Sequence, residues 1–253
     1  SSFRRRRILL RRTIPLGDTK INFSRAQIVF SFSAKSYNEQ MDKQLALREL
    51  ETEIIKNDSL PLRESRLVFG EGNPNAAVMF IGEAPGFHED QQGRPFVGRG
   101  GKLLDEVIAS IGWKREKVYI TNIVKRRPPE NRDPLPDEIE AYKPYLTKQI
   151  EIIGPKIIVP LGRFATNYFL PLAKITRDQG IAFKVGGRVV VPMLHPAAAL
   201  RGTGAMNQFR ESFKKLPGIL EGVLSGTFTP AVVEAIGPAH PEKKKHPQSK
   251  LFL

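Results

Sequence analysis

The chain contains no cysteine among its 253 residues. Disulfide bonds, thiolate metal sites and a cysteine nucleophile are therefore excluded, and cysteine usage says nothing about the redox compartment. No apolar run approaches the ~18 residues that are needed to cross a bilayer. We accordingly expect no membrane partner, and we predict a monomer.

Several catalytic signatures are also missing. The glycine-rich turn at residues 98–101 is not followed by the Gly-Lys-Ser/Thr of a Walker loop and lacks GxGxxG spacing, which argues against a nucleoside triphosphate site. No HExxH or similar ligand spacing supports metal-dependent hydrolysis. The GxSxG pattern of serine hydrolases is absent as well.

Acidic side chains are scarce: 26 Asp and Glu face 40 Lys and Arg, which leaves a net charge of +14. Such an excess favours a polyanionic partner, nucleic acid before membrane. Half of it, +7, lies in residues 1–40. We interpret this stretch as a basic, disordered extension, or as upstream sequence translated ahead of a start at Met41. The alternative is an organelle transit peptide; otherwise the protein is expected in the cytoplasm, associated with the nucleoid.

Apolar strands and amphipathic helices alternate after Met41. Strands are expected at residues 77–81, 117–121, 156–161 and 188–194, with a short strand-like run at 67–69. Helices are expected at residues 41–55, 102–111, 136–153, 164–170 and 205–215. This alternation predicts a three-layer α/β/α fold around a central four-stranded parallel sheet.

Polar residues follow the expected strands directly. Glu83, Asn122 and His195 each come at or just after a strand end. Because the carboxyl ends of parallel strands share one edge of a sheet, these side chains should converge there, with Phe96 nearby. Taken alone, an asparagine such as Asn122 is more often a helix N-cap than a ligand-binding residue. A histidine such as His195 is more often structural, and a phenylalanine such as Phe96 is more often part of the core. Together they suit a planar heterocycle that is stacked on a ring and read by an amide.

The runs GEAPGFHEDQQGRPFVGRGGKLLDEVI, VYITNIVKRRPPENRDPLPDEIEAYKPYLTKQI, IIVPLGRFAT and VVPMLHPAAALR resemble the successive motifs of family 4 uracil-DNA glycosylases. The resemblance covers residues 41–216, and the motifs occur in the family's order. It implies hydrolysis of the N-glycosidic bond of deoxyuridine in DNA, after the base has been flipped into the pocket. The alternative is a non-catalytic or very slow relative that binds uracil or DNA. On this basis we expect a glycosylase domain at residues 41–222, followed by a flexible tail at 223–253.

The resemblance also implies roles for single residues. Phe96 would stack on uracil, Asn122 would read its amide edge, and His195 would hydrogen-bond the oxygen that gains charge as the bond breaks. Backbone N–H groups of Gly82 and Glu83 would line the same pocket. Glu83 is the candidate for orienting or activating the water.

Members of this family hold a 4Fe-4S cluster through four cysteines, and here those places carry Asn57, Leu60, Arg126 and Tyr142. All four ligands are missing together, while the residues expected in catalysis are present. We therefore predict an enzyme without metal or cluster, in which side chains pack around Leu60 and Tyr142 in the cluster's place.

DNA contacts are expected from two segments. The basic loop offers Lys125, Arg126, Arg127 and Arg132 for phosphates, with a merely solvated loop as the alternative. In the run that resembles the family's minor-groove loop, Leu200 would wedge into the gap left by the flipped base, next to Arg201.

The last residues, QSKLFL, resemble the short peptides by which repair enzymes dock on sliding clamps. Gln248, Leu251 and Phe252 would make that contact at the end of a Lys- and Pro-rich tether. The alternative, held open equally, is a tail end with chance apolar residues.

Overall fold

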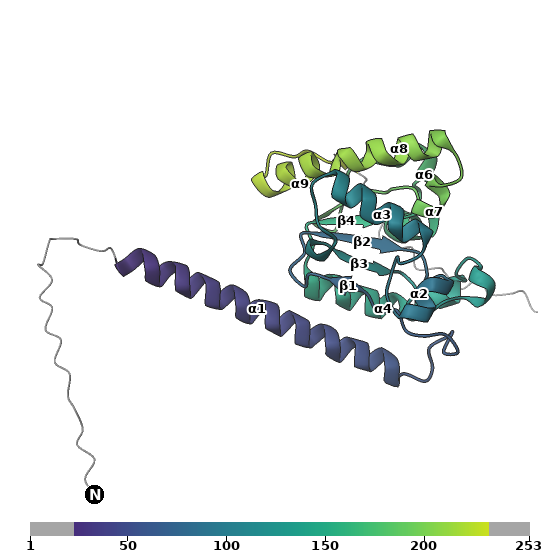
Figure 1. Cartoon of the computed structure of the whole chain (residues 1–253), viewed down its shortest axis with the longest axis horizontal. Coiled ribbons are helices and arrows are strands. Elements are labelled where there is room, and N and C mark those ends of the chain that lie inside the picture. The colour runs from purple at the N-terminus through teal and green to yellow at the C-terminus, as the bar shows by residue number, and fades with distance from the viewer. Residues whose placement is uncertain (1–22, 233–253) are drawn as a thin grey trace, which may run out of the picture. The chain divides into compact units, whose positions relative to one another are not determined.

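The computed structural model describes residues 23–232, with the side chains of residues 38–231. The chain divides into two units, residues 1–39 and residues 40–253. The strands are β1 (Glu71–Gly72), β2 (Val78–Gly82), β3 (Tyr119–Asn122), β4 (Ile157–Pro160), β5 (Phe183–Val185), β6 (Arg188–Val190) and β7 (Ala231–Val232). The helices are α1 (Phe23–Lys56), α2 (Phe87–Gln92), α3 (Arg99–Ser110), α4 (Pro136–Ile153), α5 (Arg163–Phe169), α6 (Ile175–Asp178), α7 (Pro196–Ala199), α8 (Thr203–Lys214) and α9 (Leu216–Ser225), as Figure 1 shows.

The strands form one sheet in the order β1-β3-β2-β4-β6-β5-β7. The four predicted strands are its parallel centre, β3-β2-β4-β6. The sheet is wider than predicted, because β1 and β5 add antiparallel neighbours and β7 pairs with β5. These three added strands have only two or three residues each, too few to show an alternating pattern in the sequence.

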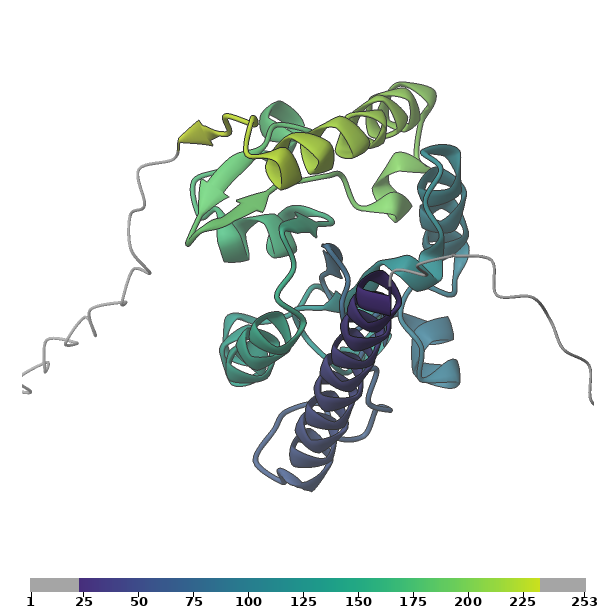
Figure 2. The ribbon, with the colours of Figure 1, turned by 90° about the vertical axis from the view of Figure 1, so that its left-hand side faces the viewer.

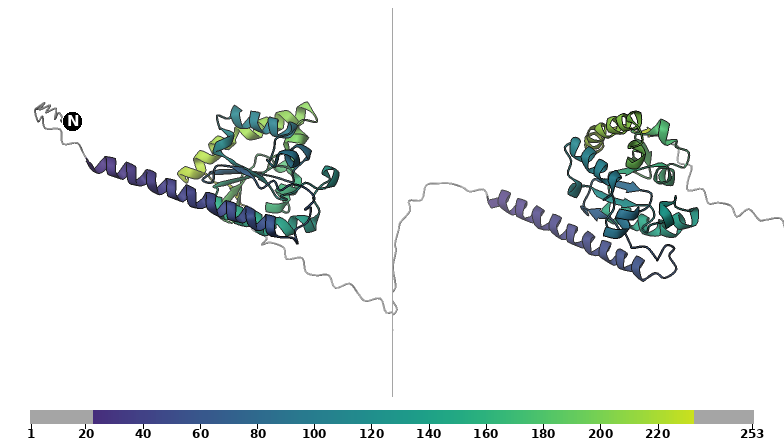
Figure 3. Two further views of the ribbon diagram at one scale, coloured as in Figure 1. Left: turned by 60° about the horizontal axis from the view of Figure 1, so that its bottom comes forward. Right: turned by 45° about the vertical axis from the view of Figure 1, so that its right-hand side comes forward.

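Helices cover both faces of the sheet, so the predicted three-layer α/β/α fold is confirmed. Along β2, Phe80 faces one core with Leu104 and Ile108 of α3 and Phe209 and Phe213 of α8. Its neighbours Met79 and Ile81 face the opposite core, which is built with residues of α4 and with Leu47, Leu50 and Ile54 of α1. Figures 1 and 2 show α8 and α9 on one side of the sheet and α4 on the other, and Figure 3 keeps that separation in two further views.

Several predicted boundaries differ from the structure, and the largest differences lie at the two ends of the described part. Helix α1 begins at Phe23 instead of Met41. Residues 23–56 contain neither Gly nor Pro, so nothing local ends the helix at Met41, where only the apolar periodicity starts. At the other end, the folded part continues beyond residue 222, since α9 runs to Ser225 and β7 pairs with β5.

The structure also tests the predictions for the 67–69 run, for helix α4 and for membrane-spanning helices. The 67–69 run is no strand, although Val68 and Phe69 are buried. Helix α4 has the predicted bounds, and Gly154, with φ of 65°, ends it in a left-handed conformation. No helix in residues 23–232 has the length and apolar character to cross a bilayer. The proposed clamp peptide and residues 1–22 lie outside the described residues.

Candidate active site

The strand ends do converge, as the sequence predicts. Gly82 at the end of β2 is in register with Asn122 at the end of β3, and Leu161 after β4 bridges to Met193, two residues before His195. A cavity of about 550 Å³ opens at this edge of the sheet. Its lining includes every predicted base-binding residue except Gly82, namely Glu83, Phe96, Asn122 and His195.

Asn122 brings a buried, unsatisfied acceptor to the cavity. The residue is 2% exposed, and its side-chain Oδ1 has no hydrogen-bond partner among the described residues. Gly82 allows this placement, because a Cβ there would lie 2.3 Å from Asn122 Oδ1 and 2.5 Å from Phe96 Cζ. A buried acceptor without a partner costs about 1–3 kcal/mol, which makes it a candidate for binding a ligand's N–H group.

Phe96 is held in a left-handed backbone conformation, with φ of 52°. Such a conformation is uncommon for a bulky residue, and residues with strained backbones of this kind cluster at functional sites. Gly101 permits it, since a Cβ at that position would lie 1.9 Å from Phe96 O. The Phe96 ring lies 5.7 Å from the His195 ring, with 30° between their planes. The two rings therefore lie next to each other in the lining of the cavity.

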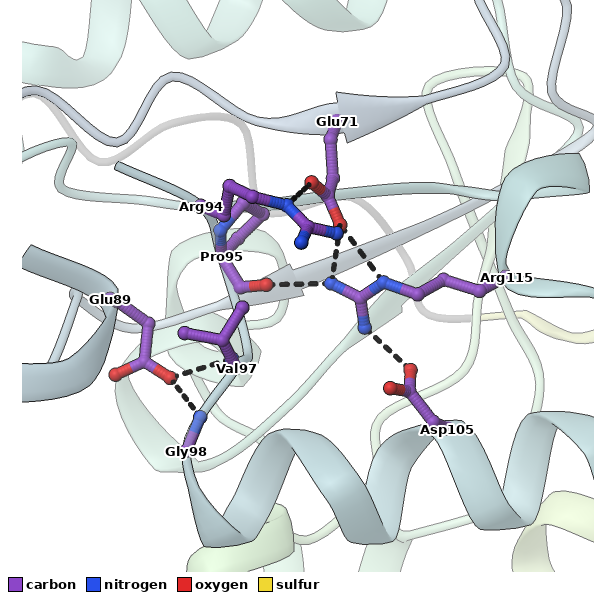
Figure 4. A network of polar contacts seen from close by, with 8 residues as sticks. All are labelled: Glu71, Glu89, Arg94, Pro95, Val97, Gly98, Asp105 and Arg115. Carbon is purple, nitrogen blue, oxygen red and sulfur yellow. Dashed lines mark hydrogen bonds and ion pairs between the residues drawn. The ribbon is translucent and has the colours of Figure 1, made fainter. Parts of the chain in front are cut away.

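Two polar clamps hold the loop that carries Phe96 (Figure 4). Glu89 Oε1 accepts hydrogen bonds from the N–H groups of Val97 and Gly98, both at 2.8 Å. On the other side, Arg115 donates to Pro95 O at 2.6 Å. The residue with the strained backbone is thus fixed from both flanks. Sequence reasoning missed both clamps, because an acidic and a basic side chain in a loop look like solvated charges.

Arg115 is itself locked in place. It donates to Glu71 Oε1 at 2.7 Å and to Asp105 Oδ1 at 2.5 Å, and Arg94 donates to the second oxygen of Glu71 at 2.7 Å. Burial raises the pKa of Glu71, but the hydrogen bonds from Arg94 and Arg115 outweigh it and hold that pKa below its usual value. Glu71 therefore stays charged and anchors the Arg115 clamp.

His195 precedes α7 and caps it. Its Nδ1 accepts the N–H of Ala197 at 3.2 Å, so a neutral imidazole carries its proton on Nε2. The pKa of His195 is lowered from 6.5 to about 4, mainly by burial and to a smaller extent by Arg201, while Glu89 opposes the shift. The side chain is consequently a neutral hydrogen-bond donor near neutral pH.

Glu83 reaches across to the start of α5. Its Oε1 accepts the N–H of Phe164 at 2.8 Å, and Gly162 leaves room for it, since a Cβ there would lie 2.5 Å from Glu83 Oε1. Burial raises the pKa of Glu83, while the N–H of Phe164 pulls it down. The carboxylate is thus held at a helix N-terminus and faces the cavity.

The structure contradicts two of the predicted phosphate contacts. Lys125 is 0% exposed and donates to Thr121, Asn122 and Gln149. Arg126 is 8% exposed, and its guanidinium donates to the main-chain oxygen of Ser65. Both side chains turn into the protein, where they satisfy buried acceptors, so neither can reach a DNA phosphate.

The other four predicted DNA contacts lie at the surface. Arg127 donates to Asn131 at 2.7 Å, and its guanidinium lies 5.2 Å from the centre of the Phe87 ring. Arg132 lines the cavity and is paired with Glu138 at 2.6 Å. Leu200 is 38% exposed, and Arg201 is exposed and lines the cavity.

Of the four positions that the resemblance relates to cluster ligands, Leu60, Arg126 and Tyr142 are buried and Asn57 is half-buried. Leu60 is 6% exposed and Tyr142 is fully buried in the same core. Tyr142 donates to Pro61 O at 2.8 Å, and Asn57 donates to the hydroxyl of Tyr145 at 2.6 Å. These side chains offer no thiolate, so they do not fit an iron-sulfur cluster. No metal-binding group of His, Asp or Glu occurs in the part of the chain that the structure describes.

Comparison with known proteins assigns the class. Residues 69–216 match the uracil DNA glycosylase superfamily, and the chain belongs to it. Within that class, it is 46% identical over 183 residues to the type-4 uracil-DNA glycosylase of Sulfurisphaera tokodaii, which covers 68% of this chain and 83% of the relative. The type-4 enzyme of Archaeoglobus fulgidus is 42% identical over 182 residues, 68% of this chain and 92% of the relative. That of Thermotoga maritima is 45% identical over 161 residues, 61% of this chain and 84% of the relative.

Proposed function

We propose that this chain is a uracil-DNA glycosylase that hydrolyses the N-glycosidic bond of deoxyuridine in DNA and leaves an abasic site for base-excision repair. The observation that carries the proposal is the pairing of an unsatisfied acceptor, Asn122 Oδ1, with a neutral donor, His195, in one cavity beside the Phe96 ring. The relatives named above, which are called type-4 uracil-DNA glycosylases, support the same activity.

Each of these residues has a part in recognising the base. The flipped uracil stacks on Phe96, and its N3–H donates to Asn122 Oδ1, which ends the cost of leaving that oxygen unpaired. Cytosine has no proton on N3, so it would leave Asn122 Oδ1 unpaired. The amide is thus the group that distinguishes the two bases.

The chemical step separates charge. The C1′–N1 bond breaks, its electron pair leaves with the base as a uracil anion, and the sugar becomes oxocarbenium-like. The Nε2–H of His195 donates to the O2 atom, where the negative charge collects. Water then adds to C1′ and gives its proton to Glu83, and transfer of that proton to the uracil anion completes the hydrolysis. Glu83 is proposed to orient that water from the start of α5, and its raised pKa makes it a better proton acceptor.

We also propose how the DNA is held. Arg132 and Arg201 line the cavity, and Arg127 lies against Phe87, another lining residue. These three arginines would contact phosphates, and exposed Leu200 would occupy the gap in the base stack. Docking of the tail on a sliding clamp through Gln248, Leu251 and Phe252 is a separate proposal. A pull-down with tail-truncated protein tests it, and equal capture of both forms would reject it.

The activity is tested with a uracil-containing oligonucleotide that is incubated with the protein and then treated with alkali. A strand break at uracil is expected with the wild type, and at least a hundredfold slower cleavage with His195→Ala. Binding of the oligonucleotide without any break would instead identify a non-catalytic uracil-binding relative.

The enzyme is further proposed to work without an iron-sulfur cluster, because the sequence offers no cysteine to ligate one. The purified protein should show no iron in elemental analysis and no visible cluster absorbance. Its activity should be the same before and after treatment with an iron chelator. Stoichiometric iron in active protein would contradict this.

A further inference from the structure

Lys125 is a fully buried cation next to the active site. Its Nζ donates to Thr121 Oγ1 at 2.7 Å, to the main-chain oxygen of Asn122 at 2.8 Å and to Gln149 Oε1 at 2.5 Å. None of these three contacts involves a carboxylate. Buried lysines are rare and are usually paired with an acid, so this one calls for a specific role.

The hydrogen bonds around Lys125 fix its protonation pattern. Thr121 uses its hydroxyl proton on Phe69 O at 2.7 Å, and the amide nitrogen of Gln149 donates to the same oxygen at 3.0 Å. Thr121 Oγ1 and Gln149 Oε1 are therefore left as acceptors, and Asn122 O can only accept. Burial pushes the pKa of Lys125 well below its usual range. Three acceptors around one nitrogen act against that shift, because only the ammonium form supplies three protons.

One of the three acceptors leads directly to the base-binding site. The main-chain oxygen held by Lys125 belongs to Asn122, whose side-chain Oδ1 is the unpaired acceptor at the cavity. The neighbouring N–H groups are fixed as well, since Ile123 donates to Gly82 O at 2.9 Å and Val124 donates to Glu83 O at 3.0 Å. Lys125 completes this frame from the buried side, just where β3 ends.

We propose that Lys125 is a positioning residue for base recognition, whose ammonium group holds the main chain of Asn122 so that the amide stays aimed at the flipped base. This inference rests on the proposed glycosylase function. Lys125 would fix the position of the Asn122 amide, and a displacement of about 1 Å in such a site costs on the order of a hundredfold in rate. The electrostatic effect of its charge on the departing anion is a distinct role, and the experiment separates the two.

The experiment is a pair of double-mutant cycles, measured as single-turnover rates of uracil excision with the full chain in excess over DNA. Lys125→Met is combined with Asn122→Ala in one cycle and with His195→Ala in the other. Lys125→Met alone should slow excision about 10- to 100-fold. If Lys125 acts through Asn122, this loss should shrink to within about threefold in the Asn122→Ala background and keep its full size in the His195→Ala background.

A matched control is Thr121→Val, which removes another acceptor of the same network and leaves the contact between Lys125 and Asn122 in place. Its rate should stay within about threefold of the wild type, although its stability falls by an amount comparable with one buried hydrogen bond. Thermal unfolding of every variant shows whether the altered proteins fold. If Lys125→Met does not fold, Lys125→Gln, which keeps a polar side chain in the pocket but loses the ammonium group, takes its place with the same expected pattern.

An undiminished loss in the Asn122→Ala background would overturn the positioning role, and equal losses in both backgrounds would assign Lys125 to charge stabilisation instead. Unchanged excision by folded Lys125→Met would also overturn it. A wild type that does not excise uracil would refute the proposed function itself, and the two failures are therefore distinguishable.

Discussion

Asn122 places a carbonyl oxygen in the protein interior without a hydrogen-bond partner among the described residues. A folded protein usually avoids this arrangement, because the oxygen loses its bonds to water and gains nothing in return. The cost is recovered only when a ligand with an N–H group enters. Stability and activity at this residue are therefore expected to move in different directions.

Asn122→Ala should abolish at least 99% of the excision rate but leave the free energy of unfolding unchanged or raise it by up to about 1 kcal/mol. The physical reason is that the substitution removes the unsatisfied oxygen together with the group that reads the base. Single-turnover excision and denaturant unfolding measure the two quantities. A variant that is destabilised by several kcal/mol would show that the amide has a structural role.

His195 gives a prediction about pH. Its pKa is lowered to about 4 in the folded chain, so between about pH 6.5 and pH 4 the unfolded chain binds a proton that the folded chain does not. The contribution of this residue to stability is therefore complete above pH 6.5 and declines as the pH falls to 4. Unfolding of the wild type and of His195→Gln is compared from pH 8 to pH 4.

The wild type should lose stability relative to His195→Gln only between about pH 6.5 and pH 4. The excision rate of the wild type should likewise not change around pH 6.5, because His195 does not titrate there. A difference that stays constant down to pH 4 would mean that His195 keeps an ordinary pKa.

At the scale of single elements, the loop from Pro95 to Gly98 depends on its two clamps. Arg115→Met removes the donor to Pro95 O, leaves Asp105 without this partner and leaves Glu71 with Arg94 alone. It should destabilise the fold by about 1–3 kcal/mol and lower kcat/KM about tenfold, because the Phe96 ring loses its fixed position. Lys148→Met is the control, since it breaks the exposed pair with Glu53 and should change stability by less than about 1 kcal/mol. Equal effects of the two substitutions would contradict the clamp.

Elements with a long apolar pattern could be predicted from the sequence. Helix α4 has the bounds that Pro136 and Gly154 indicate, and the four parallel strands were found from apolar runs. Short elements could not be predicted: α7 has four residues and β5 three, so each spans little more than one period, too little to show a repeating pattern. The start of α1 at Phe23 was missed because the sequence upstream of Met41 lacks the periodicity, although it has no helix breaker.

The candidate site was predicted more fully than the DNA surface. Convergence of Glu83, Asn122 and His195 follows from the rule that parallel strands end at one edge, and a side chain at a strand end has little choice of direction. A lysine or arginine in a loop does have that choice. Lys125 and Arg126 turn inward to bond buried oxygens, while Arg127 beside them stays at the surface. Whether such a side chain turns inward depends on hydrogen-bond partners that lie far away in the sequence, such as Gln149.

At the scale of the whole molecule, the net charge of +14 favours DNA, and the fold supplies one cavity in which a base can be stacked, read and released. Leu60 and Tyr142 are buried in the core that α4 and α1 build, and neither residue lines that cavity.

The most direct measurement of this account is the free base released from double-stranded oligonucleotides that contain either one uracil or one cytosine at the same position. The wild-type protein should release one equivalent of uracil per oligonucleotide and no cytosine, and Asn122→Ala should release uracil at no more than about one hundredth of that rate. Release of no uracil, or of both bases at similar rates, would contradict the central claim that this cavity recognises and excises uracil.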